Sequence, residues 1–209
     1  LDKRVPGFVS GLKSTGVPSV TLVTNAELLN EKKSSDLLKS GLDELLISID
    51  GYSEEVYSSL RIGLDFEKVV DNTLSFLELR NDMQSNLSVR IRMVVVDENK
   101  EEVEPFLRFW NSKVSNGDRV QALPAHSWGN ELYIESKAAI AMMSPKPCIA
   151  PFNMFTIHYD GEVTMCGHDY KHNHVMGDLN VSTIEEIWKG ERFEDIRTRH
   201  LTPGRRNEI

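Results

Sequence analysis

The chain of 209 residues contains two cysteines, Cys148 and Cys166, and these are the side chains best suited to redox or metal chemistry. Cysteine thiolates are ligands of iron–sulfur clusters and of zinc. Two thiols can also pair with each other, or they can remain buried or free without any chemical role. The sequence around the two cysteines is therefore needed to distinguish between these alternatives.

The stretch between the two cysteines predicts a β-hairpin. Residues 155–159 alternate apolar and polar side chains, which is the period of a half-buried strand, and residues 163–165 resume this alternation. Asp160-Gly161 lies between them and predicts a tight turn with positive φ angles. Because Cys148 precedes this hairpin and Cys166 closes it, the fold could bring the two thiols together.

A short helix is expected after the hairpin. Ser182 is followed three residues later by Glu185, which is the spacing of a capping box at a helix N-terminus. Ile184, Ile187 and Trp188 then give this helix an apolar side.

This C-terminal region resembles the auxiliary-cluster domain of radical SAM enzymes, which is called SPASM in its long form and twitch in its short form. The resemblance implies that Cys148 and Cys166 are two ligands of an auxiliary iron–sulfur cluster, which needs about four. It places the remaining ligands in a cysteine pair beyond Ile209, so this chain would hold half of the site. Gly167-His168 stands where the long form often has a further ligand, which favours the short form. The residues that fill the family pattern are Cys148, Gly161, Cys166, Asp169, Tyr170, Gly177, Asp178, Ser182, Glu185, Ile187 and Trp188.

Residues 1–143 are predicted to form alternating strands and helices. This alternation is typical of βα units around a parallel sheet, and right-handed crossovers would place its four strands in sequence order. The composition changes at residues 144–147, where we expect a linker to a second domain. The expected strands are 19–24, 44–49, 89–96 and 119–123, and the expected helices are 2–14, 31–40, 53–57, 66–77 and 103–110.

Polar side chains follow the predicted strands. Ligands of parallel α/β sheets bind outside the C-terminal ends of the strands. Those ends carry Asn25, Ser48, Asp50, Asp97 and His126.

The same region resembles the second half of a radical SAM barrel. The matching residues are Thr24-Asn25-Ala26, Ser48-Ile49-Asp50-Gly51 and the stretch from Arg61 to Val69; Ala26 replaces a usual glycine, and Ile62 separates Arg61 from Gly63. The resemblance implies an α/β fold: the C-terminal part of a partial (β/α)6 TIM-like barrel over residues 1–143, represented by its last four βα units. A small α+β hairpin-and-helix domain of the SPASM/twitch kind follows at 144–209.

Radical SAM enzymes bind their catalytic cluster through a Cys-x-x-x-Cys-x-x-Cys loop, and no cysteine precedes Cys148 here. We therefore expect this chain to be part of a longer protein and to be inactive by itself. For the parent protein, the resemblance implies reductive cleavage of S-adenosyl-L-methionine (SAM) to a 5′-deoxyadenosyl radical, which takes a hydrogen atom from a peptide or small-metabolite substrate. It also implies a reductant protein, such as a flavodoxin or ferredoxin.

The resemblance nominates Ser48, Asp50, Arg61 and Asn25 as SAM-binding residues. A hydroxyl and a carboxylate suit the ribose and methionine ends of the cofactor, and Arg61 could pair with its carboxylate. Each residue also has an ordinary explanation. Polar side chains at strand ends cap turns, arginines occupy surfaces, and asparagine is common in turns.

A non-catalytic zinc-binding module on an α/β scaffold is the alternative. Three histidines and an aspartate follow Cys166 closely and could bind zinc together with the two cysteines. The usual zinc-ligand spacings are absent, and a solvated loop explains the same residues. They are His168, Asp169, His172 and His174.

Composition excludes two classes of partner. The net charge is −8 and the isoelectric point is about 5.3, without the clustered Lys and Arg that a nucleic-acid partner requires. We find neither an apolar run long enough to cross a bilayer nor a signal peptide, and expect a cytoplasmic protein without a membrane partner.

Overall fold

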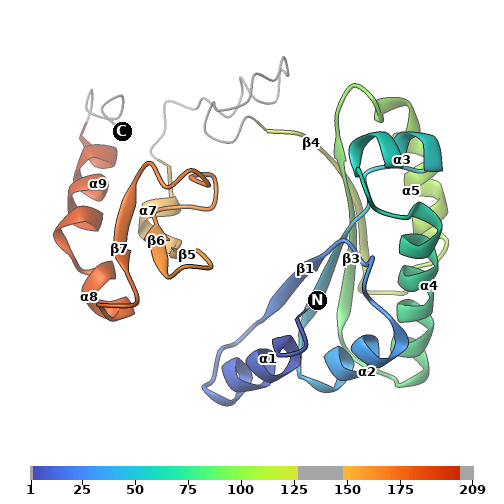
Figure 1. Cartoon of the computed structure of the whole chain (residues 1–209), viewed down its shortest axis with the longest axis horizontal. Coiled ribbons are helices and arrows are strands. Elements are labelled where there is room, and N and C mark those ends of the chain that lie inside the picture. Colours follow the sequence, from blue (N-terminus) through green and yellow to red (C-terminus); the bar gives the residue numbers. More distant parts are fainter. Residues whose placement is uncertain (1, 127–147, 203–209) are drawn as a thin grey trace. The chain divides into compact units, whose positions relative to one another are not determined.

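A computed structural model describes residues 2–126 and 148–202 of the chain (Figure 1). The chain divides into two compact units, with the boundary between Ala125 and His126. The linker expected at residues 144–147 lies outside the described residues. Each unit has its own sheet and its own hydrophobic core.

In the first unit, helices alternate with strands along the chain. They are α1 Val5–Ser14, β1 Thr21–Thr24, α2 Glu31–Lys39, β2 Glu44–Ser48, α3 Glu54–Leu60, α4 Phe66–Asp82, β3 Ser88–Val95, the 3-10 helix Lys100–Glu102, α5 Val103–Asn111 and β4 Arg119–Pro124.

The four strands form a parallel sheet in the order β1-β2-β3-β4, which confirms the predicted fold class and strand order. The pairing places Ser48 of β2 beside Arg92 of β3, and Arg92 beside Gln121 of β4. Because paired residues in neighbouring parallel strands lie on the same face of the sheet, these three side chains share one face.

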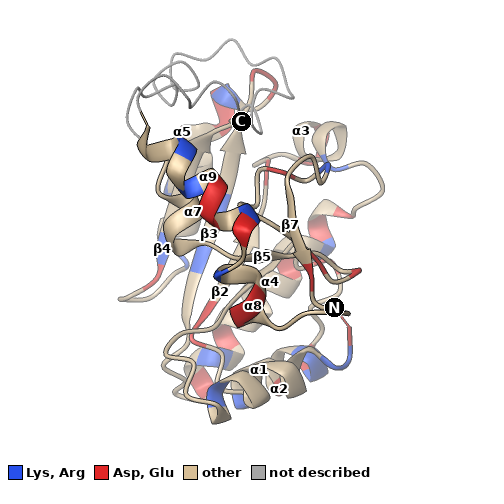
Figure 2. Ribbon diagram, turned by 90° about the vertical axis from the view of Figure 1, so that its left-hand side faces the viewer, with Lys and Arg blue, Asp and Glu red and all other residues tan. Residues whose placement is uncertain are grey.

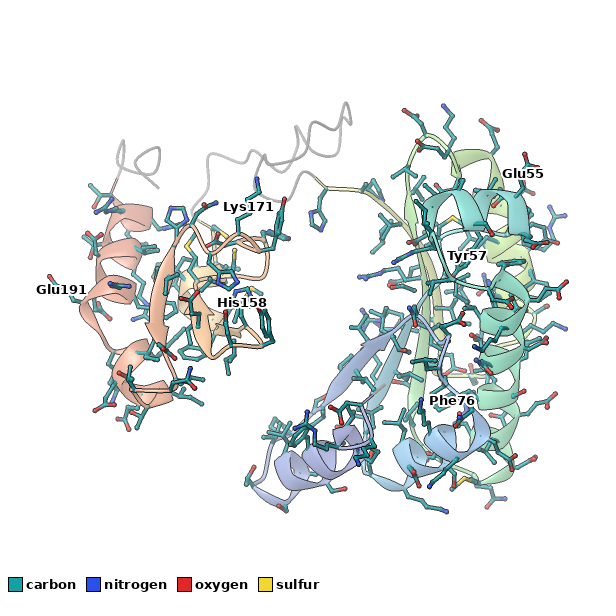
Figure 3. The ribbon with its side chains drawn as sticks, viewed as in Figure 1. Glu55, Tyr57, Phe76, His158, Lys171 and Glu191 are labelled. Carbon is teal, nitrogen blue, oxygen red and sulfur yellow. The ribbon has the colours of Figure 1, made fainter. Side chains whose placement is uncertain are left out.

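The two faces of this sheet differ in chemistry. One face carries fully buried side chains such as Ile47 and Ile91, which belong to the same core as Tyr57, Phe76 and other helix residues. Figure 3 labels Tyr57 and Phe76, which come from α3 and α4. The opposite face, called the polar face below, carries Glu44, Ser48, Arg90, Arg92, Arg119 and Gln121.

Local sequence signals explain where the helices begin and end. The Asn30 side chain accepts a hydrogen bond from the Lys33 N–H and caps α2, while Gly41 follows the helix with a φ of +85°. Ser53 caps α3 and Asp65 caps α4 in the same manner as Asn30 caps α2.

The second unit is small and mixed. Its strands β5, β6 and β7 form an antiparallel sheet in that order, and β5 and β6 are the two arms of the predicted hairpin. The elements are α7 Ala150–Asn153, β5 Thr156–Ile157, β6 Glu162–Thr164, β7 Val175–Asp178, α8 Ile184–Trp188 and α9 Glu191–Leu201.

Three local predictions for this unit were wrong. In the hairpin turn only Gly161 has a positive φ, of +96°, and Asp160 does not. The capping box is formed by Thr183 and Glu186, one residue later than expected, because both reciprocal bonds are made by this pair. Ile184 is exposed, so Ile187 alone of α8 is buried.

The core of the second unit is formed by Val163, Met176, Ile187, Phe193 and Ile196. At the edge of this core, the ring of Phe155 stacks on that of Phe193, with the ring centroids 6.0 Å apart.

Neither unit has a helix suited to a bilayer: within residues 2–126 and 148–202, every helix is too short or too polar to cross one. Basic and acidic residues are intermixed along α2 and α9 (Figure 2). This mixture agrees with the absence of a basic stripe in the sequence.

Candidate functional site

The C-terminal ends of β1 and β2 border an open depression of about 410 Å³ on the first unit. Three of the four predicted cofactor residues line it: Asn25, Ser48 and Arg61, together with Val23 and Thr24. The fourth, Asp50, is buried, and its carboxylate accepts a hydrogen bond from Arg61, which lines the depression. The structure therefore brings all four predicted residues to one end of the sheet.

Asp50 fixes Arg61. One carboxylate oxygen, Oδ2, accepts hydrogen bonds from the Nε of Arg61 at 2.8 Å and from its terminal nitrogen Nη2. The other, Oδ1, accepts the N–H of Val94 in β3 at 2.8 Å. The Asp50 side chain is thus a positioning group, and Arg61, one-third exposed, is the one that faces the depression.

Asn99 holds the backbone beneath this pair. Its side chain is fully buried and donates to the carbonyl oxygens of Asp50 at 3.0 Å and Val94 at 2.9 Å. It also accepts the N–H of Val96 at 2.8 Å. An asparagine amide that ties β2 to β3 in this way fixes the strand ends on which the candidate site is built.

The turn after β1 is strained at Ala26. Its φ is +61°, in the left-handed region that favours glycine, and its side chain is fully buried. Asn72 donates to the Ala26 carbonyl at 2.9 Å, and the Asn25 side chain accepts the Glu27 N–H at 3.2 Å. Asn25 thus stabilises this turn and also lines the depression. Its ordinary role as a turn residue and its candidate role in binding a cofactor are therefore compatible.

Tyr57 is fully buried next to this site. Burial raises the pKa of its phenol, the positive charge of Arg61 opposes that rise, and Glu27 and Asp50 add to it. Its hydroxyl oxygen has no hydrogen-bond partner in the described structure. Tyr57 stays neutral and is a packing residue, with its ring centroid 5.3 Å from that of Phe66.

In the second unit, Cys148 is exposed and precedes α7, and Cys166 is half-buried just after β6. Neither cysteine forms a disulfide. The buried hydroxyl of Thr164 donates to the Cys166 carbonyl oxygen at 3.1 Å and lies 3.0 Å from Nε2 of His158. Thr164 thereby anchors the backbone that presents the Cys166 thiol.

Asp169 anchors the loop that follows Cys166. Its N–H donates to the Cys166 carbonyl at 3.2 Å, and its two carboxylate oxygens accept the N–H groups of Asn173 at 2.8 Å and His174 at 2.7 Å. These bonds explain why an aspartate suits this position without any metal.

Among the residues that the structure describes, the candidate zinc ligands of the alternative interpretation do not come together as one set. In the described part of the chain, the triad whose ligand atoms all lie within 4.8 Å of one another is Asp160, Glu162 and His172. Of these, only His172 belongs to the candidate set, and its Nδ1 lies 2.5 Å from the Glu162 carboxylate. The sequence analysis missed this grouping because it depends on the hairpin turn meeting a loop ten residues further on.

A family comparison decides the nature of the second unit. Residues 148–208 match the family SPASM, described as an iron–sulfur cluster-binding domain. Residues 148–208 therefore form a SPASM domain. Cys148 and Cys166 both lie within the matched residues, so the resemblance based on them is confirmed at the level of the family.

Two solved structures with bound AdoMet are similar to this chain in fold. BtrN in complex with AdoMet and 2-DOIA is 20% identical with a TM-score of 0.54, and the match covers 99% of this chain and 64% of BtrN. Native anSMEcpe with bound AdoMet and the Kp18Cys peptide is 15% identical with a TM-score of 0.65, covering 96% of this chain and 67% of that one. This chain thus spans about two thirds of their length, and at these identities the likeness concerns the fold. A search of curated proteins gave no match.

Proposed function

We propose that the SPASM domain and the four βα units belong to a radical SAM enzyme, with the SAM site in the depression at the ends of β1 and β2. The observation that carries this proposal is the convergence of Asn25, Ser48 and Arg61 on that depression, in a chain that ends in a SPASM domain. Fold likeness to two AdoMet-bound enzymes supports it.

The size and the chemistry of the depression support this assignment. Its volume of about 410 Å³ lies within the range of about 300–1,000 Å³ typical of small-molecule sites. It combines a guanidinium, a hydroxyl and an amide with the exposed apolar side chain of Val23. SAM carries a carboxylate, hydroxyl groups and an apolar ring system, which these side chains complement.

Each residue then has a distinct task. Arg61, held rigidly by Asp50, would bind the carboxylate of SAM as a charge-assisted pair. Ser48, which can donate and accept, would bind a hydroxyl or amino group, and Asn25 would offer its amide nitrogen. When bound to a reduced cluster, SAM supplies a 5′-deoxyadenosyl radical for hydrogen abstraction, and the protein contributes position and exclusion of water.

Cys148 and Cys166 would supply two thiolates to an auxiliary iron–sulfur cluster. Both are free of disulfides, and the contacts of Thr164 and Asp169 fix the chain around Cys166. A four-thiolate cluster needs about two further ligands, and the sequence has no other cysteine to offer. We propose that these ligands, and the three thiolates of the catalytic cluster, come from outside this sequence.

The substrate of the parent enzyme is proposed to be a peptide or a small metabolite. BtrN was solved with 2-DOIA and anSMEcpe with a peptide, so the shared fold accommodates both classes. A flavodoxin or ferredoxin would deliver the electrons.

The test is anaerobic reconstitution of the full-length protein with iron and sulfide, followed by reduction and measurement of 5′-deoxyadenosine. We expect formation of 5′-deoxyadenosine by the full-length protein and none by residues 1–209 alone. Arg61→Met should weaken SAM binding, while Arg90→Met, on the same sheet and paired with Glu44, should not. A cluster-loaded parent that never cleaves SAM would contradict the proposal, and zinc without iron would favour the alternative metal module.

A further inference from the structure

Arg92 lies in the middle of β3 on the polar face of the sheet. Its register partners on that face are Ser48 of β2 and Gln121 of β4. The Nε atom of Arg92 is buried, and no described residue provides it with a hydrogen-bond partner. Within the described residues, its guanidinium forms no hydrogen bond or ion pair that could satisfy it.

Arg90 provides the contrast on the same face. It lies two residues earlier on β3, and its guanidinium donates three hydrogen bonds to the Glu44 carboxylate, at 2.6, 2.7 and 3.1 Å. The sheet therefore neutralises one arginine with its own carboxylate and leaves the next one without a counter-ion. A buried donor without a partner is costly and requires an explanation.

The surroundings of Arg92 point to a ligand as the missing partner. Ser48, its neighbour in β2, lines the depression proposed for SAM, but Arg92 does not. A molecule bound by Arg92 would therefore lie beside the cofactor site. The planar guanidinium fork matches oxyanions such as carboxylates and phosphates, and it binds them with two parallel hydrogen bonds.

We propose that Arg92 is the anion-binding residue of the substrate subsite and that the substrate presents a carboxylate or phosphate group to the polar face. This inference rests on the proposed function, because it identifies the neighbouring depression as the SAM site. It narrows the substrate class to acidic molecules, including peptides with an acidic side chain.

The test uses the full-length protein, labelled with ¹⁵N-arginine and prepared without iron so that paramagnetism does not broaden the signals. The Nε–Hε signal of Arg92 is assigned by its loss in Arg92→Lys, and acetate and inorganic phosphate are titrated separately. We expect this signal to shift and saturate with one or both anions, and a preference between them identifies the group on the substrate.

A second measurement does not depend on the apoprotein. Anion-induced thermal stabilisation of the reconstituted protein should show at least about tenfold weaker binding in Arg92→Gln and no change in Arg90→Gln, whose counter-ion is Glu44. The inference is overturned if both anions leave Arg92 unaffected, if Arg92→Gln binds them as well as wild type, or if a protein carboxylate pairs with Arg92 in the full-length protein. If the wild-type enzyme cleaves SAM and any of these results is obtained, only the inference about Arg92 is wrong. If the wild-type enzyme does not cleave SAM, the proposed function itself is wrong.

Discussion

Asp50 and Arg61 form an ion pair that joins the end of β2 to the end of α3. The carboxylate binds the arginine through Oδ2 and the Val94 N–H of β3 through Oδ1. Arg61 follows α3 directly, so the pair fixes the helix end against two strands. The same pair aims the guanidinium of Arg61 at the depression, which links the stability of this region to its proposed binding of SAM.

Asp50→Asn tests whether the Asp50–Arg61 pair contributes to SAM binding as well as to stability. The amide keeps an oxygen for the Val94 N–H but loses the charge that holds Arg61 in place. Because hydrogen bonds to charged groups contribute about 1.5–3 kcal/mol, we expect SAM affinity to fall about tenfold or more. Isothermal titration of SAM into the reconstituted full-length protein measures this change.

Glu44→Gln is the matched control for that variant. Glu44 is the first residue of β2, whereas Asp50 follows the other end of this strand, and Glu44 pairs with Arg90. It should cost stability without changing SAM affinity. Equal losses of SAM affinity in both variants would mean that Asp50 acts only through general stability.

Gly51→Ala should destabilise the first unit by about 1–3 kcal/mol. A Cβ at Gly51 would lie 2.8 Å from the backbone N and Cα of Tyr57, so α3 would have to move away from the strand end. In Gly7→Ala, by contrast, the new methyl group meets no atom of the described residues within 4 Å, and alanine favours the helix. Urea unfolding should therefore show opposite signs for the two substitutions.

The buried pair of Arg80 and Asp118 should make stability depend on pH. Burial raises the pKa of Asp118, but hydrogen bonds from Arg80, Ser115 and Val89 together with the charge of Arg80 outweigh it, so its pKa lies below the ordinary value. A depressed carboxyl pKa stabilises the fold above the ordinary pKa of about 3.9, and this contribution is lost as pH falls through the folded-state pKa.

Asp118→Asn should therefore cost roughly 3–5 kcal/mol at neutral pH, since it leaves Arg80 buried without a counter-ion. The difference from wild type should shrink below about pH 4. The exposed pair of Glu104 and Arg108 is the comparison, and Glu104→Gln should change stability by less than about 1 kcal/mol. A pH-independent cost of Asp118→Asn, measured by urea unfolding, would argue against the ion pair.

Thr164→Val should loosen the backbone around Cys166. The substitution keeps the shape of the side chain but removes the hydroxyl that contacts His158 and the Cys166 carbonyl, at a cost of about 1–3 kcal/mol. Hydrogen exchange of residues 156–166 should become faster. Thr156→Val is the control, because Thr156 pairs with Thr164 across the hairpin. Unchanged exchange in Thr164→Val would show that the hydroxyl does not hold Cys166 in place.

Much of the first unit could be predicted because its signals are local. Apolar strands, capping residues such as Asn30 and Ser53 and the glycine after α2 each act over a few neighbours, and the handedness of crossovers then orders the strands. The pairs Asp50–Arg61 and Arg80–Asp118 left no trace in the periodicity, since each joins residues that only tertiary folding brings together.

The second unit was predicted less completely for identifiable reasons. Ser182 and Thr183 are both competent caps with a glutamate three residues on, and only the path of the chain selects Thr183. The strand β7, which contains Gly177 and Asp178, lacks the β-branched alternation of a typical strand. Its glycine is required by packing, because a Cβ there would lie 2.7 Å from the Ile187 side chain.

The most direct test of the central claim is the iron content of the reconstituted full-length protein, compared between wild type and the double variant Cys148→Ser/Cys166→Ser. If these two thiols hold an auxiliary cluster, the double variant should lose the iron and sulfide of one cluster and still cleave SAM to 5′-deoxyadenosine. Unchanged iron content, or zinc in place of iron in wild type, would contradict the account.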